Sequence, residues 1–103
     1  MLQQVHSRHF QPLLGQTGSL TLPDGSRLPV RFETLEETPR AKLPNIERMP
    51  FSVELNSLES TPFVDGLCEL EVPELGKIEG VFVSRMPPMG RDPALGYFYI
   101  AFN

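Results

Sequence analysis

Apolar and polar residues alternate along much of this chain, which is the pattern of β-strands that bury one face. Residues 28–34 and 68–72 show the alternation most clearly. The turn residues Asp24-Gly25 supply the positive-φ position of a tight connection, so the two strands around them are predicted to form a hairpin. Strands are predicted at residues 19–22, 28–34, 51–55, 68–72, 77–85 and 96–103.

Two of these strands are apolar on both faces. The last eight residues, Gly96–Asn103, are mostly aromatic and aliphatic, and residues 77–85 place Ile78 and Phe82 on one face with valines on the other. Both strands are therefore predicted to be covered on both sides, within a closed sheet or by a partner. If the chain leaves one side open, we expect a homodimer; the alternative is a closed monomeric barrel.

Near the N-terminus the apolar residues are spaced as in a helix and not at every second position. Phe10, Leu13 and Leu14 have i, i+3, i+4 spacing and Gly15 can end the turn, which predicts one short helical turn at 10–14. Eleven prolines and eight glycines leave no room for a long helix elsewhere. The predicted fold is a single all-β domain over residues 1–103, a small antiparallel barrel or sandwich of about six strands.

The amino-acid composition limits the kinds of partner and the compartment that can be expected. Thirteen acidic residues against nine Lys and Arg give a formal charge of −4, so nucleic-acid binding is not expected. No signal peptide or membrane span is expected, which predicts a cytoplasmic protein. The lone Cys68 fits a reducing compartment and is predicted to be a small buried hydrophobe.

Candidate chemistry is sparse. His6 and His9 are the only pair of close metal-ligand types, and zinc would need a third or fourth ligand, so we expect a solvated, frayed N-terminus and no metal or cofactor. The carboxylate pairs Glu36-Glu37 and Glu69/Glu71 are predicted to lie in a loop and on an outward strand face. No nucleophile elbow or phosphate-binding loop is present, and we expect no enzymatic activity.

Recognition of a protein partner remains, and two loops combine residue types suited to it. Arginines and flexible methionines suit adaptable contact surfaces, and apolar residues in an exposed loop suggest a binding site. The candidate partner-binding residues are Arg40, Leu43, Ile46 and Met49 in loop 39–49, and Arg85, Met86, Met89 and Arg91 in loop 85–93. Whether the two loops form one site stays open.

Several turn and core signatures occur in order along the chain: Phe10 with Pro12-Leu13-Leu14-Gly15, Asp24-Gly25, Phe51-Ser52-Val53, Pro73-Glu74-Leu75-Gly76 and Ala101-Phe102-Asn103. Together they resemble a family of short bacterial domains of unknown function. Its members are often encoded beside phage-tail-collar-like proteins, so the resemblance implies a phage-tail-like assembly. The expected function is a non-enzymatic structural or protein-interaction module. A small-molecule-binding β-barrel is the alternative.

Overall fold

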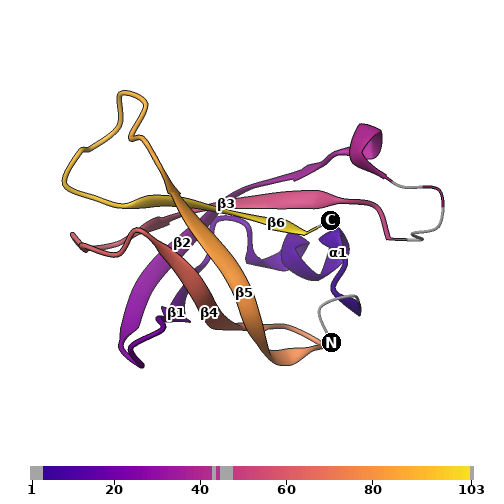
Figure 1. The fold of residues 1–103 in the computed structure, drawn as a ribbon, viewed down its shortest axis with the longest axis horizontal. Helices are drawn as coiled ribbons and strands as arrows, with labels where there is room; N and C mark the ends of the chain where they lie inside the picture. Colours follow the sequence, from indigo (N-terminus) through magenta and orange to yellow (C-terminus); the bar gives the residue numbers. More distant parts are fainter. Residues whose placement is uncertain (1–3, 43, 45–47, 103) are drawn as a thin grey trace.

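The computed structural model describes residues 4–42, 44 and 48–102. Six strands form a closed barrel in the order β1-β2-β3-β6-β5-β4, and all neighbouring strands are antiparallel (Figure 1). The elements are α1 (Ser7–Phe10), η2 (Gln11–Leu13), β1 (Thr17–Thr21), β2 (Arg27–Glu37), η3 (Pro39–Ala41), β3 (Phe51–Ser57), β4 (Asp65–Val72), β5 (Gly76–Met86) and β6 (Tyr97–Phe102), where η marks a 3₁₀ turn. The predicted all-β barrel with one short N-terminal helix is confirmed.

The predicted hairpin joins β1 to β2. Gly25 has a φ of +88°, a backbone conformation that costs glycine little. The Asp24 carboxylate accepts hydrogen bonds from the Ser26 amide at 2.9 Å and from its hydroxyl at 2.6 Å. These bonds fix the turn locally, and the strands leave it in the register that pairs Leu20 with Leu28.

Aromatic side chains fill one end of the barrel. Phe10 is fully buried, and its ring centroid lies 6.3 Å from that of Phe32, 5.9 Å from Phe51 and 5.5 Å from Phe102. The rings of Phe51 and Phe102 are stacked at 4.7 Å. Helix α1 therefore closes this end of the barrel, beside the C-terminal end of β6 (Figure 1).

The helical segment starts earlier than predicted. It runs from Ser7 through η2 to Leu13 instead of over 10–14, and both Val5 and His9 are buried. The expected frayed segment is therefore wrong for residues 5–10, because Val5, His9 and Phe10 are packed against the barrel. None of the helices in the described ranges is long and apolar enough to cross a membrane.

Within the chain, strand β6 is covered on one face only, so the predicted coverage of both faces within a closed sheet is wrong. Phe98, Ile100 and Phe102 point into the core, whereas Tyr99 is 42% exposed on the outside. β6 is central, between β3 and β5, but the outer face of a barrel has no second layer over it. Tyr97 is the outward exception, because it is buried beneath the guanidinium of a loop arginine.

Strand β5 also has one buried face, because it contains a β-bulge. Cys68 pairs with Val81 and Leu70 pairs with Ile78, so two residues of β5 face one residue of β4. Gly80, with a φ of +69°, takes the left-handed position of this bulge. The extra residue puts Ile78 and Val81 on the same inner face and leaves Phe82 outside, contrary to the period-two reading.

Strand β2 is longer than predicted and reaches Glu37, which pairs with Phe51 at the start of β3. Glu36 and Glu37 are therefore exposed strand residues and not loop residues. The outward positions predicted for Glu69 and Glu71 on β4 are confirmed.

Candidate functional site

Strands β4 and β5 carry an apolar pair on the outside of the barrel. Leu67 and Phe82 are directly opposite each other in the register, and are 61% and 54% exposed. Tyr99 of β6 pairs with Ser84, two residues from Phe82, and so lies diagonally next to it. We call Leu67, Phe82 and Tyr99 the outer-face patch. Outward strand positions are normally polar, so adjacent apolar ones are typical of a contact surface.

Acidic side chains flank the outer-face patch. Glu54 and Asp65 lie in the same cross-strand row as the patch tyrosine. Beyond the other side of the patch, the Lys77 Nζ atom lies 3.6 Å from a Glu69 carboxylate oxygen and 3.8 Å from one of Glu79. One lysine against four carboxylates leaves this face with a net negative charge.

Two open clefts lie on the surface of the barrel. One, of about 480 Å³, separates part of β1 from part of β4. The other, of about 460 Å³, lies between the β1–β2 hairpin and residues 59–65, and includes the carboxylates of Asp24, Glu59 and Asp65. The first cleft reaches the core, because the core residues Phe32, Leu70 and Val72 are part of its lining.

Two residues of the predicted binding loop 85–93 hold the loops in place. The Arg85 guanidinium donates hydrogen bonds to the carbonyls of Thr61 and Phe63, at 2.9 and 2.8 Å. Arg91 stacks on the Tyr97 ring at 3.9 Å, and its Nε donates to the Pro88 carbonyl at 2.8 Å.

The methionines of this loop differ in exposure. Arg85 and Met86 are strand residues and not loop residues as predicted, because β5 continues to Met86. Met86 is half-buried, and Met89 is 79% exposed. Met89 is therefore the exposed methionine of this segment.

The other predicted loop, 39–49, lies elsewhere. Arg40 is exposed and Met49 is half-buried, while Leu43 and Ile46 lie outside the described residues. Figure 1 places η3 and the connection between β5 and β6 at opposite ends of the long axis, so Arg40 and Met89 do not share a site.

Sequence reasoning missed Arg48 in loop 39–49. Its guanidinium donates to the Val5 carbonyl at 3.1 Å and lies 5.9 Å from the centre of the Phe102 ring. Burial lowers the pKa of Arg48. This residue links the loop to the segment before α1.

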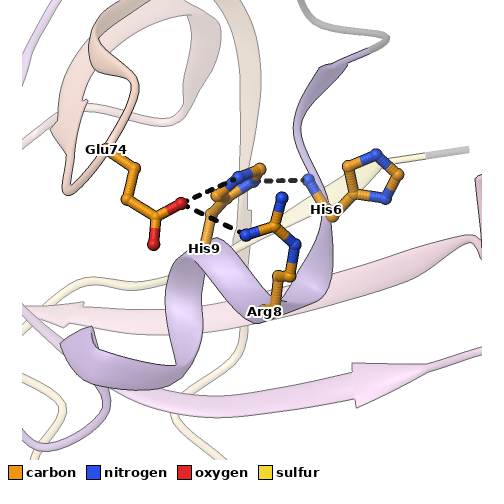
Figure 2. A network of polar contacts seen from close by, with 4 residues as sticks. All are labelled: His6, Arg8, His9 and Glu74. Atoms are coloured by element: carbon orange, nitrogen blue, oxygen red, sulfur yellow. Dashed lines mark hydrogen bonds and ion pairs between the residues drawn. The ribbon is translucent and has the colours of Figure 1, made fainter.

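A polar network fastens helix α1 to the β4–β5 turn (Figure 2). The buried His9 accepts a hydrogen bond at Nδ1 from the His6 amide at 2.9 Å, and its Nε2 lies 3.7 Å from Glu74. Arg8 donates to the same Glu74 oxygen at 3.1 Å. Burial lowers the pKa of His9, and the nearby Arg8 charge acts in the same direction, so the ring is neutral at pH 7. These contacts link helix α1 to the β4–β5 turn.

The chain matches the family described as a domain of unknown function, DUF6916, over residues 5–102. The chain belongs to this family. The match spans every strand of the barrel, so the DUF6916 domain and the folded unit coincide. Comparison with curated proteins and with solved structures finds no match for this chain.

Within this DUF6916 domain, Cys68 is a core residue. It is buried, as predicted, and burial raises the pKa of its thiol to about 11. The thiol is therefore protonated at neutral pH and is a poor nucleophile. Over the described ranges, no three His, Cys, Asp or Glu side chains gather in a metal-binding arrangement.

Proposed function

We propose that the protein is a non-enzymatic interaction module that docks a protein partner on the outer-face patch. The observation that carries this proposal is the pairing of Leu67 with Phe82, both more than half exposed at neighbouring outward positions. Each is held by a regular strand, so a partner meets a pre-formed surface and little conformational entropy is lost on docking. Small interfaces of this kind are typical of transient contacts.

The charges around the patch favour a basic partner. Glu54 and Asp65 on one side, and Glu69 and Glu79 beyond the other, are complementary to Lys and Arg on an opposing surface. A second copy of this chain would bring the same carboxylates against themselves. The acidic rim therefore argues for a different protein over a homodimer.

The resemblance to proteins encoded beside phage-tail-collar-like proteins supplies a biological context. In our proposal the domain is an accessory of a phage-tail-like assembly, and its partner is a neighbouring component. The packing of Phe10, Phe51 and Phe102 inside the barrel leaves the outer surface as the place for recognition.

Affinity capture from the native host, with the neighbouring gene products present, tests the proposal. The tagged wild-type protein is compared with Phe82→Ser, and the captured partner is then measured by titration. Two exposed apolar residues outside the patch give matched controls, Leu58→Ser at 44% exposure and Met89→Ser at 79%. We expect Phe82→Ser to weaken binding more than tenfold, as for a central interface residue, and both controls to bind normally.

The outcomes separate the candidate surfaces. Loss of binding in Met89→Ser with retention in Phe82→Ser would assign the partner to loop 85–93 and contradict the proposal. Sedimentation of the purified protein at micromolar concentration is expected to give a monomer. A dimer that Phe82→Ser dissociates, with an unchanged urea midpoint, would make a second copy the partner and contradict the charge argument.

A further inference from the structure

The barrel is held together weakly at one seam, between β1 and β4. These strands share a single pair, Thr21 with Glu69, whereas every other neighbouring pair of strands shares at least three. Extending the antiparallel register would put Ser19 opposite Glu71. The strands separate instead, and the cleft of about 480 Å³ lies between them.

The separation leaves main-chain groups without a strand partner. In a β-strand, N–H and C=O groups point alternately to the two neighbours, and β2 and β5 occupy only one side of β1 and β4 here. No strand in the described ranges lies against 17–20 of β1 or 70–72 of β4 within the seam. An edge of this kind is a template for an added strand.

The cleft offers main-chain groups and a limited apolar surface to a ligand. Its core lining residues Phe32, Leu70 and Val72 are each at most 3% exposed, so the apolar contact area comes mainly from the half-buried Leu13 and the exposed Pro73. Within residues 17–20 of β1, Gly18 and Leu20 bond to β2, so the main-chain groups that face the seam are those of Thr17 and Ser19.

The charged residues of the cleft indicate which side chains a bound peptide should carry. The charged side chains that line the cleft are Arg27, Glu69, Glu71 and Lys77. Arg27 lies in the row of Thr21 and Glu69, where the seam is still paired, whereas Glu71 lies at the level of Ser19, where the strands separate. Glu71 is exposed and makes no ion pair with another described residue. Its register partner Lys77 is directed instead to Glu69 and Glu79. A Lys or Arg side chain on an inserted strand could form an ion pair with Glu71.

We propose that the β1–β4 seam binds an extended, basic segment of a partner protein, which adds a strand antiparallel to β1 and places Lys or Arg beside Glu71. The segment must be free of its own sheet, because a strand within a folded barrel brings its neighbours and cannot enter between β1 and β4. This site is separate from the outer-face patch, so either proposal can fail without the other.

The probe for the experiment is a capped hexapeptide of alternating Lys and Val, titrated into the ¹⁵N-labelled full chain and followed by NMR. We expect amide exchange at Thr17 and Ser19 to slow at least tenfold when the peptide saturates, because these amides face the seam while those of Gly18 and Leu20 already bond to β2. A peptide of the same sequence, N-methylated at alternate residues to remove its main-chain donors, is expected not to bind. Glu71→Gln should weaken binding about two- to five-fold, as expected for an exposed ion pair.

Glu33→Gln is the matched control, because Glu33 is an exposed carboxylate on β2 outside the cleft. It is expected to leave the affinity unchanged. Absence of added protection at Thr17 and Ser19 at millimolar peptide would overturn the proposal, as would equal binding of the N-methylated peptide. Shifts confined to Leu67, Phe82 and Tyr99 would place the peptide on the patch instead. Protection at Thr17 and Ser19 before any peptide is added would mean that the chain fills its own seam, and would also overturn it.

Discussion

Truncating Phe10 to alanine tests whether α1 is a structural plug of the barrel. The Phe10 side chain is fully buried and contacts three other phenylalanine rings within 6.3 Å. Large-to-small substitution of a buried phenylalanine costs about 3–5 kcal/mol of the free energy of unfolding, from lost transfer energy and from the cavity left behind. Since small domains are stable by about 5–15 kcal/mol, Phe10→Ala should remove a large fraction of the total.

The assay is urea unfolding followed by circular dichroism, with the m-value compared between variants. Phe82→Ala is the matched control, because the same substitution at a 54% exposed position should cost about 1 kcal/mol or less. Phe10→Leu keeps most of the volume, and it should cost less than about 1.5 kcal/mol and remain measurable if the alanine variant does not fold. A loss for Phe10→Ala no larger than for Phe82→Ala would refute the plugging role of α1.

Three further predictions concern the bulge, the thiol and the buried histidine. Gly80→Ala should cost about 1–2 kcal/mol in urea unfolding from backbone strain alone, because φ is +69° and an added Cβ meets nothing within 4 Å; an unchanged midpoint would contradict this. With a pKa of about 11 and a buried thiol, Cys68 should react with a thiol reagent at pH 8 only as fast as the barrel opens, and a free-thiol rate would contradict its burial. Because the pKa of His9 is lowered from 6.5, the unfolded state binds the extra proton. The free energy of unfolding should therefore fall as pH drops below 6.5, down to the folded pKa, and His9→Gln should reduce this dependence.

The strands and the first hairpin were predictable because their signals are local. Period-two alternation fixes which residues of 28–32 and 68–72 face the core, and Asp24-Gly25 fixes the turn. The short helix was predictable from the spacing of Phe10 and Leu13. Its earlier start was not, because the segment before Phe10 packs on parts of the chain that are distant in the sequence, as the contact of His9 with Glu74 shows.

The position of Phe82 shows where local reasoning fails. A period of two assigns it to the face of Ile78, but one inserted residue reverses every assignment beyond the insertion. Gly80, an isolated glycine within a strand pattern, was the available signal of a bulge. A bulge placed at Gly80 moves Phe82 to the outer face and Val81 to the inner face, as the structure has them.

The outer-face patch was missed for a related reason. The apolar residues on both faces of 77–85 and 96–103 were visible in the sequence, but were interpreted as coverage of both faces. Leu67 also comes from another part of the chain, and only the β4–β5 register puts it opposite Phe82. Which residues face one another across two strands can be predicted only from the strand register, and the bulge alters this register.

Strand β4 contributes to both proposed surfaces, because Leu67 belongs to the patch and Glu71 lines the seam, with Glu69 between them. Among the described residues, Glu69 forms an ion pair with Lys77 at 3.6 Å, and Glu71 forms none. The salt dependence of binding therefore distinguishes the two surfaces, since screening weakens exposed charge pairs and leaves apolar contacts intact. Between about 0.1 and 1 M salt, peptide affinity at the seam should fall steeply in the wild type and less in Glu71→Gln, whereas the patch partner should retain the share of its affinity that comes from Leu67 and Phe82. Equal salt dependence in the wild type and Glu71→Gln would exclude the charge pairing at the seam.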